Sequence, residues 1–86
     1  MQVLIVFDST HYALQAEQAL QSAGMSLDTI PTPREITASC GLSVSLPEQQ
    51  LPAALQIMRS HGVVFRAIYN LMLRDGKKHY LLREED

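Results

Sequence analysis

The sequence has 86 residues, of which 47% are hydrophobic and 19% are charged, and its formal net charge is −2. This length supports one small hydrophobic core, so we expect a single domain over residues 1–86, and the composition excludes a disordered chain. Seven basic against nine acidic residues leave little attraction for phosphate, and we therefore expect no nucleic-acid partner.

Cysteine content and the apolar runs indicate the compartment. Cys40 is the single cysteine, which excludes an internal disulfide and favours a reducing environment. The apolar run at residues 3–7 is far shorter than the ~20 residues that cross a bilayer, and no basic region precedes it. We expect a cytoplasmic protein with no membrane helix and no secretion signal.

The first third of the chain predicts a strand followed by a helix. Residues 3–7 are continuously apolar and mostly branched, which is typical of an interior strand. Residues 8–10 then offer three candidate helix caps, and Gly24 is expected to end the helix. The apolar face of this helix consists of small or branched residues that allow close packing on a sheet: Ala13, Ala16, Leu20 and Ala23.

Two further strands flank the segment that carries the cysteine. Residues 26–32 predict a short strand that stops at Pro31 and Pro33, because proline cannot donate to a sheet ladder. Residues 42–46 alternate strictly between apolar residues and serine, which predicts a half-buried strand with its serines on the uncovered face.

A second helix and a hairpin complete the predicted elements. The helix begins at Pro47 and carries an apolar stripe up to Gly62, with Pro52 implying either a separate first turn or a distorted one. Residues 63–73 predict a strand. The Asp75-Gly76 pair predicts a tight hairpin to a final edge strand over residues 77–82, and residues 83–86 are expected to form a solvated tail.

The order strand, helix, strand, strand, helix, strand predicts an α+β fold, a ferredoxin-like βαββαβ sandwich with an added C-terminal edge strand. Right-handed crossovers in this topology place the turn after the first strand and the loop between the second and third strands at one end of the sheet. We therefore expect residues 8–11 to meet the loop that contains Cys40.

That end of the sheet can favour a thiolate. A helix N-terminus carries about half a positive charge, which lowers the pKa of a neighbouring thiol. His11 and Arg34 would add to this effect, although His11 alone is more simply an exposed helix residue and Arg34 alone can pair with Glu35. His11, His61 and His79 are far apart in sequence and have no second cysteine nearby, so we expect no metal site and no cofactor.

Several short motifs resemble one known family. They are Ser9-Thr10-His11 after the first strand, Pro31-Thr32-Pro33-Arg34-Glu35-Ile36 in the loop, and Ser39-Cys40-Gly41-Leu42 at the start of the third strand. Together they resemble the small bacterial proteins described as selenium/sulfur carrier protein-like, long known only as a domain of unknown function. The segment from Pro33 to Gly41 is its most specific part, and the C-terminal hairpin at Asp75-Gly76 departs from shorter members.

The resemblance implies a carrier that holds sulfur as a persulfide, or selenium as a selenosulfide, on the reactive thiol of Cys40. It implies that Arg34, Ser39 and Gly41 shape the loop, and that Ser9, Thr10 and His11 form the adjoining turn. The implied partners are a cysteine desulfurase or a selenium-handling enzyme. The resemblance therefore favours a non-enzymatic carrier over an enzyme.

Two other functions fit the same pattern. The chain can be a ferredoxin-like interaction or regulatory module with no chemistry at Cys40, in which the edge strand of residues 77–82 pairs with another copy to give a homodimer. It can also be a small cysteine-dependent enzyme, which would need a pocket beside Cys40 with His11 and Asp8 as base and orienting group.

Overall fold

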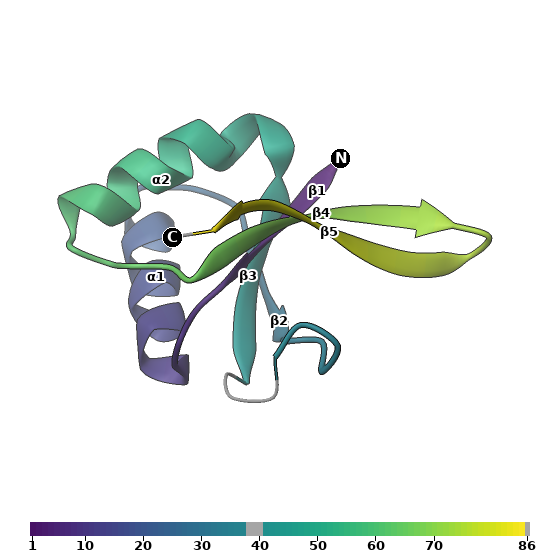
Figure 1. Ribbon diagram of the computed structural model, residues 1–86. Helices are drawn as coiled ribbons and strands as arrows, with labels where there is room; N and C mark the ends of the chain where they lie inside the picture. The colour runs from purple at the N-terminus through teal and green to yellow at the C-terminus, as the bar shows by residue number, and fades with distance from the viewer. Residues whose placement is uncertain (38–40, 86) are drawn as a thin grey trace.

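The computed structural model describes residues 1–37 and 41–85, and in these residues two helices accompany one five-stranded antiparallel sheet (Figure 1). The α+β class and the order of the elements are those predicted from the sequence. The strands are β1 (Gln2–Val6), β2 (Asp28–Pro31), β3 (Leu42–Pro47), β4 (Ala67–Arg74) and β5 (Lys77–Glu85), and the helices are α1 (Thr10–Ser22) and α2 (Leu51–Ser60).

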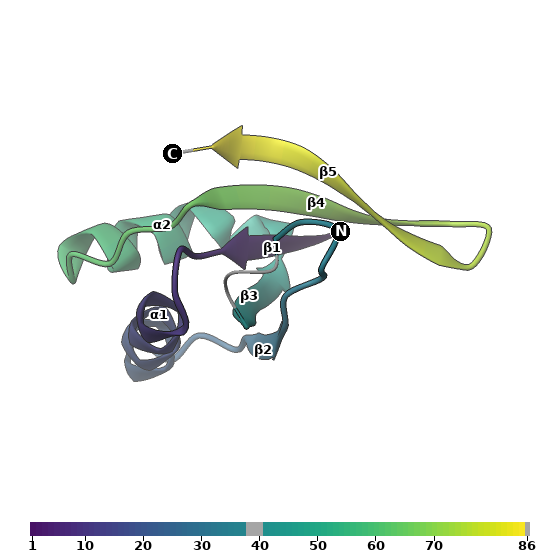
Figure 2. The ribbon, with the colours of Figure 1, turned by 60° about the horizontal axis from the view of Figure 1, so that its bottom comes forward.

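The strands follow the order β2-β3-β1-β4-β5, and all neighbours are antiparallel. Both helices cover one face of the sheet, which we call the front face, while β4 and β5 project as a hairpin beyond the start of β1 at Gln2 (Figures 1 and 2). The core lies between the front face and the helices. Its largest fully buried members are Val3, Ile5, Phe7, Leu20, Val44, Leu46, Met58 and Ile68.

Helix α1 begins where the cap residues predict. The Ser9 hydroxyl caps the helix by accepting a hydrogen bond from the Tyr12 amide at 3.4 Å. Gly24 follows the helix with a φ of +82°, a left-handed conformation that glycine adopts readily. The predicted apolar face is correct except at its end, because the helix stops at Ser22 and leaves Ala23 exposed, whereas Ala19 is buried.

The start of α2 is divided into two parts. Glu48–Gln50 form a separate 3₁₀ turn, and α2 itself begins at Leu51. Pro52 therefore lies in the first turn of α2, where its missing amide hydrogen would have no partner within the helix. Of the two arrangements that the sequence leaves open, the separate turn is the one found.

The opposite face of the sheet, the back face, is covered near β3, so the predicted half-buried strand is wrong on this point. Ser43 and Ser45 are both buried, and the hydroxyls of Ser43 and Thr32 share a hydrogen bond. On β1, Leu4 and Val6 of the same face are also buried. The cover is the segment after β2, whose Ile36 lies beside Tyr69 of β4, the residue that pairs with Leu4.

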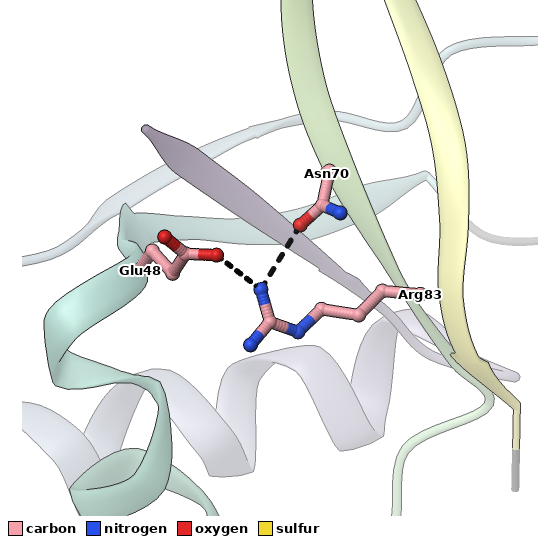
Figure 3. A network of polar contacts seen from close by, with 3 residues as sticks. All are labelled: Glu48, Asn70 and Arg83. Carbon is pink, nitrogen blue, oxygen red and sulfur yellow. Dashed lines mark hydrogen bonds and ion pairs between the residues drawn. The ribbon is translucent and has the colours of Figure 1, made fainter.

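The C-terminal part differs from the prediction at two places. Strand β4 begins at Ala67, four residues later than expected, and β5 continues to Glu85 through residues predicted to be a tail. Asp75 and Gly76 both have positive φ angles, as a tight hairpin turn of this kind requires. Arg83 fixes the end of β5 to the front face by donating hydrogen bonds to Glu48 and Asn70 (Figure 3).

Neither helix of the described residues is long and apolar enough to cross a membrane.

Candidate functional site

The end of β1 and the start of β3 lie side by side. Val6 pairs with Ser43 in the antiparallel ladder, so the chain leaves β1 toward α1 at the same end where it enters β3 from the preceding loop. A Cβ atom built on Gly41 would lie 3.6 Å from the Thr10 side-chain oxygen. The expectation that the turn after the first strand meets the loop before the third is therefore confirmed at Gly41 and Thr10.

The loop between β2 and β3 is closed at its base. Beyond the last ladder pair, Pro31 with Leu42, the Thr32 amide donates to the Gly41 carbonyl at 3.2 Å. Within the loop, the amides of Ile36 and Thr37 both donate to the Pro33 carbonyl, which forms a turn. The first of these bonds holds Thr32 beside Gly41, and the other two shape the turn that follows Pro33.

The N-terminus of α1 presents a positive end to Gly41. In any helix the first amide groups have no carbonyl partner within the helix, and Ser9 accepts only from Tyr12. Within residues 1–37 and 41–85 the amides of Thr10 and His11 therefore remain available to an acceptor outside the helix. The first turn carries no acidic residue, so no side chain there offsets the positive end of the helix dipole.

Asp8 and Arg66 form an ion pair beside this end, at 2.9 Å between Oδ1 and Nη1. The hydrogen bond from Arg66 to Asp8, and then the charge of Asp8, raise the pKa of the Arg66 guanidinium. Asp8 thus pairs with a residue of the segment before β4. His11 is exposed, and its ring lies tilted beside the ring of Tyr12. In the described part of the chain the partner found for Asp8 is Arg66, so the role of Asp8 as a group that orients His11 stays a prediction.

Arg66 is a residue that the sequence analysis missed. It lies 58 positions from Asp8 and precedes β4 outside any motif, so only the register between β1 and β4 brings the two together. The backbone reinforces this contact, because the Arg66 amide donates to the Val6 carbonyl at 2.8 Å. A cavity of about 410 Å³ borders the pair, lined by Asp8, Val64, Phe65, Arg66 and Glu85.

The predicted site residues fall into three groups. Ser9, Thr10, His11 and Gly41 come together at the end of β1 and the start of β3. Arg34 is exposed on the turn of residues 34–36, and in the described part of the chain it makes no hydrogen bond to residues 9–11. Cys40 and Ser39 lie outside the described residues.

Metal binding finds no support in residues 1–37 and 41–85, where no three His, Cys, Asp or Glu side chains gather closely enough to hold an ion. The arrangement instead combines unpaired helix amides, a glycine that allows close backbone approach, and an exposed arginine in one loop. Such groups suit an anion, either a bound one or a thiolate.

Comparison with known proteins gives one match. The family described as "Putative Se/S carrier protein-like" matches residues 2–70, which include β1 to β3, both helices and the first half of β4. No curated protein and no solved structure matches the chain.

Proposed function

The chain belongs to the Se/S carrier protein-like family, and from this membership and the geometry around Gly41 we propose that it carries sulfur or selenium on the thiol of Cys40. The single observation that most supports the proposal is the approach of Gly41 to Thr10. Gly41 follows Cys40 directly in the sequence, and Thr10 opens a helix whose first amides have no partner within the helix.

The transfer step needs no oxidant and no metal. A cysteine desulfurase carries a persulfide on its own cysteine, and the thiolate of Cys40 attacks the terminal sulfur of that persulfide. The sulfur–sulfur bond of the donor breaks, a new sulfur–sulfur bond forms on Cys40, and the electron pair of the broken bond leaves with the donor thiolate. Selenium in place of the terminal sulfur gives a selenosulfide by the same displacement.

The α1 N-terminus would assist this displacement in two ways. Its positive potential favours the thiolate over the thiol, and it also favours the persulfide anion after transfer. The exposed Arg34 would add positive charge from the same loop. Gly41 adds no side chain next to the thiol, so a donor protein can approach closely.

The architecture supports the proposal in a more general way. The order β2-β3-β1-β4, with both helices on one face, supports the ferredoxin-like arrangement, to which β5 is added at the β4 edge. A small domain of this kind can present one loop to both a donor and an acceptor protein, and the reducing cytoplasm would keep the single cysteine available.

Transfer of sulfur from a cysteine desulfurase to the full chain tests the proposal. We expect intact-protein mass spectrometry to show a gain of one sulfur atom on the wild-type chain after incubation with the desulfurase and cysteine. Supplying selenocysteine in place of cysteine should give a gain of one selenium atom if the protein also accepts selenium.

Two variants make this assay specific. Cys40→Ser should gain nothing, whereas Gln18→Ala, which alters an exposed residue of α1 away from its N-terminus, should still be loaded. Two outcomes would contradict the carrier function. In one, the wild-type chain gains neither sulfur in the reaction with cysteine nor selenium in the reaction with selenocysteine. In the other, Cys40→Ser gains as much as the wild type.

A further inference from the structure

The outer edge of β5 is long and has no strand partner among the described residues. It extends over nine residues, Lys77–Glu85, and it is the last strand of the sheet. Every second backbone amide and carbonyl group on this edge is therefore available for pairing with another strand. Natural edge strands are usually short or interrupted by proline or a bulge, whereas β5 is long, has no proline and has one bulge near its C-terminal end, at Arg83.

The charged residues at the two ends of β5 lie at matching distances in sequence from Leu81. Lys77 and Lys78 lie four and three residues before it, and Glu84 and Glu85 lie three and four residues after it. If two copies of β5 pair antiparallel with their Leu81 residues opposite each other, the lysine end of each copy lies beside the glutamate end of the other. The strand is therefore complementary in charge to a second copy of itself.

The centre of the strand is apolar and exposed. Leu81 is 51% exposed and Leu82 is 54% exposed, so both leave apolar surface that a partner strand can cover. Leu81 pairs with Asn70 and so lies on the front face, whereas Leu82 pairs with Tyr69 and lies on the back face. A second β5 would place its Leu81 against Leu81 of the first copy, and its Tyr80 against Leu82 of the first copy. Both leucines would then be covered.

The structure already holds β5 in position for such pairing. Arg83 is bound on the front face by Glu48 and Asn70 (Figure 3), so its charge is directed away from the outer edge. The ladder between β4 and β5 runs from Ala67 with Glu85 to Arg74 with Lys77. Its one irregularity is a bulge in β5, where Ile68 pairs with Glu84 and Tyr69 pairs with Leu82, so that Arg83 is the extra residue. The edge from Lys77 to Leu82 is thus regular before any partner binds.

We propose that the protein forms a twofold-symmetric homodimer by antiparallel pairing of β5 with β5 about Leu81, which joins two five-stranded sheets into one. The hairpin that projects beyond each sheet (Figure 2) then lies along the sheet of the other copy. Because Glu85 lies at the same end as Ala67 and Val6, the basic hairpin tip of one copy reaches the end of the sheet that carries the candidate site of the other.

Charge reversal tests this dimer. The pair Lys77→Glu and Lys78→Glu makes both ends of β5 acidic, and the pair Glu84→Lys and Glu85→Lys makes both ends basic. In each double variant the two ends of β5 carry the same charge, so ends that attract each other in the wild-type dimer repel each other, and we expect the dimer to dissociate at concentrations at least about tenfold higher than the wild type. Sedimentation velocity at low ionic strength measures this, with a reducing agent present to prevent a disulfide between Cys40 residues.

Restoration of the dimer gives the decisive result. An equimolar mixture of the two double variants should form a heterodimer, and the chain with all four substitutions should form a homodimer within about threefold of the wild-type dissociation constant. Asp28→Lys, a charge reversal on the opposite edge strand, serves as the control and should leave the dimer unchanged. Circular dichroism and thermal unfolding verify that each variant is folded.

Three outcomes would overturn the proposal. One is a wild-type chain that stays monomeric up to about 1 mM, the range of very weak association. Another is a wild-type dimer that both double variants form equally well, since its interface would then lie elsewhere. The third is loss of the dimer in both double variants with no restoration in the mixture or in the fourfold variant.

Discussion

The two edges of the sheet are built in opposite ways. Strand β2 has four residues, ends at Pro31 and continues into a loop that folds over the back face, so this edge offers little backbone to another chain. Strand β5 has nine residues and contains no proline. One edge is thus closed and lies next to the candidate site, and the other is open and distant from β3.

The difference between the two edges coincides with the point in the chain where the family match ends. The match ends at residue 70, in the middle of β4, so the projecting half of the hairpin and all of β5 lie beyond it. The matched part holds the buried core and the loop with the site, whereas the added part exposes large apolar side chains such as Leu73, Leu81 and Leu82. The described residues of the candidate site thus lie in the matched part of the chain, and the open edge lies beyond it.

The largest expected effect is on the free energy of unfolding, and it concerns the back face of the sheet. This face is covered at β1 and uncovered in the hairpin. Leu4 is 1% exposed and Leu73 is 73% exposed, although both side chains lie on this face. Leu4→Ala should lower the free energy of unfolding by about 2–5 kcal/mol, because it leaves a cavity in a packed region. Leu73→Ala should change it by less than about 0.5 kcal/mol.

Urea denaturation of both variants measures these changes. Equal and small effects for Leu4→Ala and Leu73→Ala would contradict the closed cover over the first half of the back face. Equal and large effects would show that the hairpin is packed against something that the single chain does not provide.

A smaller effect tests whether the loop touches the hairpin. Tyr80 of β5 lies beside Glu35 of the loop, and burial first, then the charge of Glu35, raises the pKa of the Tyr80 phenol. Because the folded state holds this proton more tightly than the unfolded state, the contribution to stability is present below the unfolded pKa of about 10 and is lost as pH rises above it.

Glu35→Gln should lower the pKa of Tyr80 without returning it to the ordinary value, since burial remains. Carbon-13 NMR of labelled tyrosines follows the titration, and the spectrum of Tyr80→Phe identifies the signal. An unchanged Tyr80 titration in Glu35→Gln would show that the loop and the hairpin do not interact, and the closed and open parts would then be independent.

Much of the fold could be predicted because its signals are local. The Ser9 cap, Gly24 after α1 and the Asp75-Gly76 turn each depend on a few neighbouring residues. The burial of Ser43 could not be predicted, because it depends on a loop that folds back over the strand. The charges of residues 83–85 indicated a tail, whereas pairing with β4 and the bonds of Arg83 make them part of β5.

The candidate site was predictable to the extent that topology determines it. The antiparallel pairing of β1 and β3 brings Gly41 to Thr10, and that pairing followed from the order of the elements. The ion pair of Asp8 and Arg66 could not be predicted from the order of the elements. It depends on the register between β1 and β4 and on a side chain that lies outside any motif. The roles of Cys40, Ser39 and Arg34 remain predictions.

The central claim is that the end of the sheet beside α1 activates the thiol of Cys40. The most direct measurement is the pH dependence of alkylation of Cys40 by a slow thiol reagent, in the folded chain and in a peptide of residues 33–44. We expect an apparent pKa in the folded chain below that of the peptide by about one unit or more, which corresponds to about 1.4 kcal/mol of preference for the thiolate. The same pKa in both, or reaction only after unfolding, would contradict the account.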